Sequence, residues 1–99
     1  MAVIQILRWK GGNQEDVERL FKASGAVYVK HGAESASAMR IYTGEQCGQW
    51  IAFVRFKDFA AQQKAAASIA KDATFKKLLA EANSISQFMG RDFAFDVPM

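Results

Sequence analysis

Residues 37–56, SAMRIYTGEQCGQWIAFVRF, decide the fold of this 99-residue chain. The two ends of the stretch, 37–43 and 49–56, are rich in β-branched and aromatic residues, which favour strands. The GEQCG between them, 44–48, supplies the small and polar residues of a turn. The stretch therefore predicts a β-hairpin.

The rest of the chain places two further strands and a set of helices around this hairpin. Asn13 and Asp58 are of the residue types that cap helix N-termini, and Gly32 suits a helix C-terminus. A break near residues 71–72 divides the second helical region. The predicted strands cover 2–10, 37–43, 49–56 and 87–97, and the predicted helices cover 14–31, 59–70 and 74–82. The order β-α-β-β-α-β predicts an α+β, ferredoxin-like domain spanning residues 1–99, with a four-stranded antiparallel sheet and its helices on one face.

Both faces of the predicted sheet are apolar, although helices on one side can cover only one of them. In the hairpin, Tyr42 is expected opposite Trp50, and Arg40 opposite Ala52. One hairpin face then carries Ala38, Arg40, Tyr42, Trp50, Ala52, Val54 and Phe56, and the other carries Met39, Ile41, Ile51 and Phe53. The last strand has Phe93, Phe95 and Val97 on one side and Phe88 and Ala94 on the other. A second sheet stacked on the open face would cover it. The alternative is ordinary exposure of surface hydrophobics.

Composition narrows the classes of function. The net charge of +3 comes from scattered basic residues, which is typical of a solvated surface and does not indicate nucleic-acid binding. No apolar stretch approaches the roughly 18 residues that span a bilayer, and the apolar N-terminal run is predicted to be a strand rather than a signal peptide. No phosphate-binding glycine loop occurs. We expect a cytoplasmic protein without membrane contact.

Several segments carry a family resemblance: KHGAE at 30–34, TGEQCGQW at 43–50, VRF at 54–56 and DATFKKLLAE at 72–81. With them, nearly the whole chain resembles the dimeric α+β barrel superfamily, which includes antibiotic biosynthesis monooxygenases and NIPSNAP-like proteins. It looks closest to small bacterial members without an assigned function. The resemblance implies a homodimer whose two sheets join into a barrel, with a pocket between helices and sheet in each protomer.

The resemblance also implies a range of activities. Some members oxidise polyketide-like aromatics without a cofactor, others bind and degrade haem, and others have no known activity. We therefore expect no cofactor; haem remains open, although no specific motif supports it. The first hypothesis is a cofactor-independent, monooxygenase-like enzyme acting on a small aromatic or phenolic ligand. The second is a non-enzymatic homodimer that binds a ligand or serves a structural role.

A third hypothesis is an RNA-binding domain, because the RNA-recognition motif shares this strand order. AFVRF at 52–56 and EDVERLFK at 15–22 are similar to parts of that domain. However, Ile51 stands in place of a stacking aromatic and Trp50 in place of a glycine. Only Phe53 is left to stack on a base.

The candidate site combines one imidazole, one guanidinium and several aromatic rings. His31, the only histidine, and Arg40 are the candidate catalytic residues. The candidate ligand-binding residues are Arg8, Trp9, Tyr28, Tyr42 and Trp50. A single histidine offers little for a metal site, so no metal is expected. Structural alternatives stay open: His31 interacting with a helix C-terminus, and Tyr42 and Trp50 forming a cross-strand pair.

Overall fold

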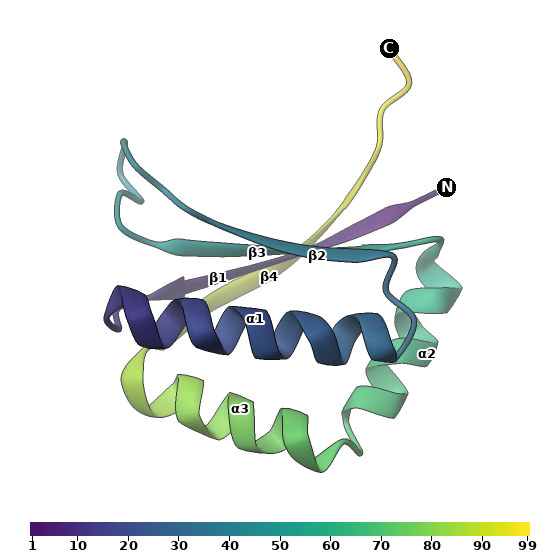
Figure 1. Ribbon diagram of the computed structural model, residues 1–99. Helices are drawn as coiled ribbons and strands as arrows, with labels where there is room; N and C mark the ends of the chain where they lie inside the picture. Colours follow the sequence, from purple (N-terminus) through teal and green to yellow (C-terminus); the bar gives the residue numbers. More distant parts are fainter.

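The chain folds in the predicted order, and its second helical region consists of two helices, as the predicted break indicates. The computed structural model describes residues 1–99 and has the order β-α-β-β-α-α-β. The elements are β1 (Val3–Lys10), α1 (Gln14–Lys30), β2 (Ser35–Arg40), β3 (Trp50–Phe56), α2 (Phe59–Ile69), α3 (Ala73–Ile85) and β4 (Gln87–Phe95). The break predicted near residues 71–72 is where α2 ends and α3 begins. Figure 1 shows α1 and α3 side by side below the sheet, with α2 at one end.

Each helix begins after a side chain that caps it. The carboxamide oxygen of Asn13 accepts a hydrogen bond from the backbone N–H of Asp16 at 2.9 Å. Asp58 and Asp72 cap α2 and α3 in the same way, at 2.7 and 3.0 Å. Gly32 follows α1 with φ of 115°, a left-handed conformation that glycine adopts without strain. The predicted caps at Asn13 and Asp58 are thus confirmed.

The four strands form one antiparallel sheet in the order β2-β3-β1-β4. The predicted hairpin register is wrong by two residues, because Arg40 pairs with Trp50 and Ala38 with Ala52. β2 ends at Arg40, so Tyr42 lies in the connecting loop and not opposite Trp50. A shift of two residues keeps every paired side chain on its predicted face, since the side-chain period of a strand is two.

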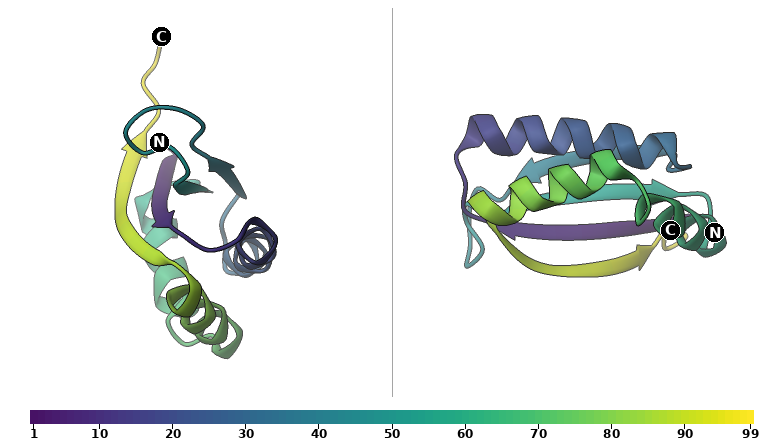
Figure 2. Two further views of the ribbon diagram at one scale, coloured as in Figure 1. Left: turned by 90° about the vertical axis from the view of Figure 1, so that its left-hand side faces the viewer. Right: turned by 90° about the horizontal axis from the view of Figure 1, so that it is seen from below.

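The helices cover the face that carries Arg40 and Trp50. Val3, Val54 and Phe56 on this face are fully buried and join Val27 of α1 and Ala65 of α2 in the core. Figure 2 shows all three helices on this side and none on the other. The sequence pattern left both faces possible, and the packing of the helices decides between them. No helix is long and apolar enough to cross a membrane.

A bulge in the pairing of β1 with β4 changes which side chains share a face. The register shifts between Arg8 and Trp9, so that Arg8 pairs with Gly90 while Trp9 pairs with Phe88. Phe88 consequently lies on the helix side with Phe93, in contrast to the prediction that placed them on opposite sides. A strict two-residue alternation cannot anticipate such a bulge.

Candidate ligand pocket

A partly open pocket of about 1150 Å³ lies between the sheet and helices α1 and α3. Pockets that take small organic ligands usually measure about 300–1,000 Å³, so this one is large enough for a ligand of several fused or linked rings. Residues from every strand and from α1 and α3 line it, and most of them are hydrophobic. Helix α3 contributes lining residues and has no buried residue of its own.

The floor of the pocket is made of two alanines and a leucine. Ala38 of β2 pairs with Ala52 of β3, and Ala52 pairs with Leu7 of β1. All three line the pocket. The next row along the sheet holds the two tryptophans, Trp50 and Trp9, which pair with each other. Large rings beside short side chains leave a hollow that the helices do not fill.

Three edge-to-face aromatic pairs build the walls. Trp9 contacts Phe88 with ring centroids 4.9 Å apart, and Phe21 of α1 contacts Trp50 at 5.9 Å. At the other end, Tyr28 of α1 contacts Phe75 of α3 at 5.5 Å. Such pairs add roughly 0.5–1.5 kcal/mol each beyond their buried area. The walls are therefore apolar and held in place by several elements.

Two guanidinium groups line the pocket without a carboxylate partner. Arg40 lies over the ring of Trp50, with its guanidinium carbon 5.1 Å from the ring centroid, and Arg91 lies 5.5 Å from that of Phe93. The arginines that form ion pairs are Arg8, Arg19 and Arg55. Since β2 and β4 are the two edge strands, Arg40 and Arg91 flank the pocket from opposite sides.

Three hydrogen-bonded polar side chains lead from the core to the pocket. Gln5 of β1 and Gln62 of α2 are both buried, 4% and 5% exposed, and the Nε2 of Gln62 donates to the Oε1 of Gln5 at 3.1 Å. The Nε2 of Gln5 in turn donates to the Tyr28 hydroxyl at 3.5 Å. Burial raises the pKa of Tyr28, an effect that the Gln5 hydrogen bond and the charge of Arg91 partly offset. Tyr28 is therefore a neutral phenol at neutral pH.

The structure brings together four of the seven side chains proposed from the sequence. Trp9, Tyr28, Arg40 and Trp50 all line the pocket. Tyr42 does not, because it lies in the loop with 89% of its surface exposed.

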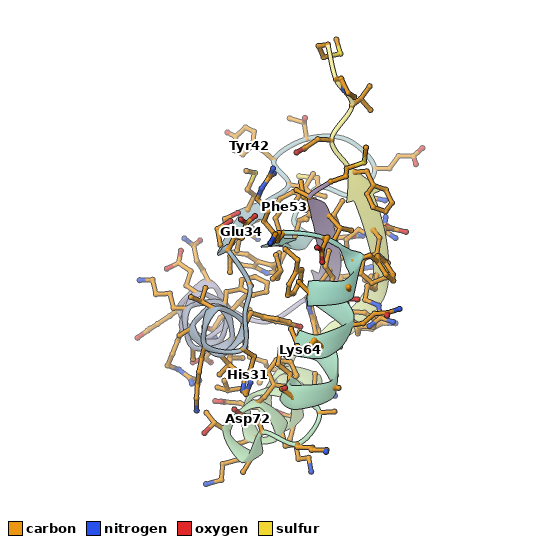
Figure 3. All side chains as sticks on the ribbon, turned by 90° about the vertical axis from the view of Figure 1, so that its right-hand side faces the viewer. His31, Glu34, Tyr42, Phe53, Lys64 and Asp72 are labelled. Atoms are coloured by element: carbon orange, nitrogen blue, oxygen red, sulfur yellow. The ribbon has the colours of Figure 1, made fainter.

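Arg8 and His31 also lie outside the pocket, each with an acidic partner. Arg8 is on the opposite face of the sheet, where its guanidinium lies 3.6 Å from the carboxylate of Asp92. His31 lies at the end of α1, and its Nε2 is 2.8 Å from the Oδ2 of Asp72 at the start of α3. Figure 3 shows the two side chains next to each other. The hydrogen bond to His31 is the main cause that lowers the pKa of Asp72.

The sequence analysis missed three residues that line the pocket, Phe21, Gln5 and Arg91, and also Gln62, which is hydrogen-bonded to Gln5. A signal for Gln5 existed, since it is the one polar residue in the VIQIL run and lies in phase with Val3. Arg91 likewise is in phase with Phe93 on the last strand. Gln62 had no such signal, because an Ala-rich helix has no strongly marked face. No group of three or more His, Cys, Asp or Glu side chains is arranged to hold a metal ion.

The fold and pocket define a ferredoxin-like α+β protein with a partly open pocket between helices and sheet, and solved structures share this fold. SnoaB, a cofactor-independent oxygenase from Streptomyces nogalater, is similar with a TM-score of 0.76 and 13% identity over 99% of this chain and 95% of its own. A NIPSNAP family protein from Agrobacterium tumefaciens has a TM-score of 0.70 and 9% identity over 100% and 94% of the two chains. A dimeric ferredoxin-like protein from an uncultured marine organism has a TM-score of 0.65 and 15% identity over 99% and 97%.

These similarities confirm the fold resemblance drawn from the sequence, to both the monooxygenase-like and the NIPSNAP-like proteins. At such low identities they show the fold alone. No protein-family profile and no curated protein matches the sequence. Function therefore has to be argued from the pocket.

Proposed function

We propose that the pocket binds a planar aromatic ligand with a phenolic or acidic oxygen, and that the protein oxidises this ligand as a cofactor-independent, monooxygenase-like enzyme. The observation that carries the proposal is an apolar, aromatic-walled pocket of about 1150 Å³ flanked by two guanidinium groups without carboxylate partners. Aromatic walls favour a planar apolar body, and unpaired cations favour an oxygen anion at its edge. The fold similarity to a cofactor-independent oxygenase supports the choice of reaction.

The reaction requires the protein only to bind the substrate and to stabilise the negative charge of its phenolate. A phenol with a free para position reacts with O₂ to give a quinone and water. One oxygen atom enters the ring, the other leaves as water with two hydrogens from the substrate, and the substrate supplies all four electrons. The electron-rich phenolate starts this reaction, and a nearby guanidinium lowers the pKa of the bound phenol. Arg40 and Arg91 are the residues that stabilise the anion in this proposal, while the aromatic walls contact the rest of the ring system.

The proposal leaves His31 without a catalytic role. Its ring nitrogen is engaged by Asp72 at 2.8 Å, and it does not line the pocket. The position at the junction of α1 and α3 supports a structural role for this pair.

Oxygen uptake with 1-naphthol as the probe tests the proposal. Protein dialysed against a chelator should consume one O₂ for each 1,4-naphthoquinone formed, and Arg40→Gln should weaken 1-naphthol binding about tenfold. Lys64→Gln is the matched control, because Lys64 is an exposed cation on α2 and lies outside the pocket. Figure 3 shows its place on that helix. Saturable binding without oxygen uptake would instead support the non-enzymatic, ligand-binding alternative.

A second copy of the chain is the proposed partner for the open sheet face. Ile4 and Ile6 of β1 alternate with the helix-facing residues, and the pairing places Phe53 directly beside Ile6. In a two-layer domain the uncovered face of an antiparallel sheet is normally polar. The loop at 41–49 and the C-terminal tail both rise on this side (Figure 1). The similarity to a dimeric ferredoxin-like protein supports a homodimer.

A further inference from the structure

The two buried amides are the part of the pocket that ordinary core packing explains least. Glutamine is seldom found fully inside, and burying its amide is costly unless it forms hydrogen bonds. Here two glutamines from different elements, Gln5 and Gln62, meet in the core and are less than 6% exposed, at 4% and 5%. Their hydrogen bond of 3.1 Å removes part of the cost and also fixes how the Gln5 amide is oriented.

The orientation of Gln5 determines what the Tyr28 hydroxyl can do. Because the Oε1 of Gln5 accepts from Gln62, its Nε2 faces Tyr28 and can only donate. A tyrosine hydroxyl has one proton and two lone pairs. Gln5 occupies a lone pair, and no protein group accepts the hydroxyl proton of Tyr28. The proton is therefore free for a molecule in the pocket, which Tyr28 lines.

We propose that the Gln62–Gln5 pair holds the Tyr28 hydroxyl as a hydrogen-bond donor to an acceptor oxygen of the bound ligand. This inference rests on the proposed function of the pocket and narrows the ligand class. The positive charge of Arg91 acts on Tyr28 and adds to the preference for a carbonyl, carboxylate or phenolate oxygen at this end. An aromatic amine, which is a donor or a cation, is disfavoured. Gln5 and Gln62 are positioning residues in this arrangement.

Two neutral probes of nearly the same shape isolate this contact. The ketone 2-acetylnaphthalene carries one acceptor oxygen, whereas 2-ethylnaphthalene carries none. Tyr28→Phe keeps the ring against Phe75 and removes only the hydroxyl. It should weaken ketone binding about fivefold to tenfold and change hydrocarbon binding by less than about twofold. Equal effects on the two probes would overturn the inference.

A second variant tests the positioning itself without removing Tyr28. In Gln5→Glu the carboxylate accepts from both neighbours and takes the Tyr28 proton away from the ligand. The infrared stretch of a ¹³C-labelled carbonyl in bound 2-acetylnaphthalene should then move towards its value in an apolar solvent, as it should in Tyr28→Phe. An unchanged stretch in Gln5→Glu would show that the pair does not orient Tyr28.

Two further outcomes keep the test decisive. If Gln5→Glu does not fold, Gln62→Leu replaces it, because it frees the Gln5 carbonyl to accept from Tyr28 and should shift the carbonyl stretch in the same direction. If wild-type protein binds neither probe, the pocket is not an aromatic ligand site, and both the proposed function and this inference fail. If wild-type protein binds both probes and Tyr28→Phe changes the two affinities equally, the pocket is an aromatic ligand site and this inference alone fails.

Discussion

At the scale of single residues, the depth of the pocket depends on alanine at position 52. Ala52 lies at the centre of the floor, between Ala38 and Leu7 in neighbouring strands. Ala52→Leu adds a branched side chain to an open space, so we expect little of the strain that overpacking causes in a closed core. The free energy of unfolding should change by less than about 1 kcal/mol, whereas binding of 2-ethylnaphthalene should weaken at least about tenfold because ligand and leucine compete for volume. Urea denaturation and fluorescence titration measure the two quantities.

A matched control for this variant is Ala66→Leu on the exposed side of α2. It adds the same side chain away from the pocket and should leave 2-ethylnaphthalene affinity unchanged. Unaltered binding in Ala52→Leu would mean that ligands do not occupy the floor of the pocket.

At the scale of elements, α3 depends on polar contacts at its start. The Asp72 carboxylate caps α3 through the backbone N–H of Phe75 and contacts His31 at the end of α1. The pKa of Asp72 is lowered, first by the hydrogen bond with His31 and then by the backbone N–H of Phe75 and the charge of Lys30. A folded-state pKa below the unfolded one means that ionised Asp72 stabilises the fold above a pH of about 4. The contribution is lost as the pH falls through the lowered pKa.

Asp72→Asn removes the negative charge but keeps the helix cap, because asparagine caps helices as well as aspartate. We expect a lower urea midpoint at pH 7 and a smaller loss of stability between pH 5 and 3 than in the wild type. The pKa of Glu81 is also lowered, by its hydrogen bond with Arg19, so its protonation should still cause part of the loss of stability in acid. An equal loss of stability between pH 5 and 3 in Asp72→Asn and wild type would contradict the prediction.

At the scale of the whole molecule, the uncovered apolar face of the sheet should be the surface where two copies meet. Phe53 lies in β3, one of the two central strands, beside Ile6 of β1, the other central strand. Phe53→Glu places a charge where the proposed dimer would bury it, so sedimentation equilibrium should give a monomer for the variant and a dimer for the wild type. Lys64→Glu on α2 is the control and should stay dimeric.

Phe53 on the same face also distinguishes RNA binding from dimer formation. Phe53 is the only aromatic residue that the strand pairing places there. A monomeric wild type whose affinity for single-stranded RNA falls with salt and with Phe53→Ala would contradict the dimer and support that alternative. A dimer without such affinity would exclude it.

The sequence by itself determined the elements, their order and, apart from Ile41 and Tyr42 in the loop after β2, the two sets of side chains on the hairpin strands. Local physics is sufficient for these features. Polar residues such as Asn13 and Asp58 satisfy the free N–H groups at helix starts, and alternation in a strand assigns side chains to faces without knowledge of the partner. The same alternation grouped Arg40 with Trp50 correctly, even though the predicted register was shifted by two residues.

Only the tertiary structure decided which of the two faces the helices cover, and hence what the pocket contains. Both faces are apolar, so the burial of hydrophobic area does not distinguish them until whole helices pack. Long-range contacts also set the bulge that turns Phe88 into the pocket, the pairing of His31 with Asp72, and the meeting of Gln5 with Gln62. Each of these joins segments far apart in the chain, and no local pattern encodes such a contact.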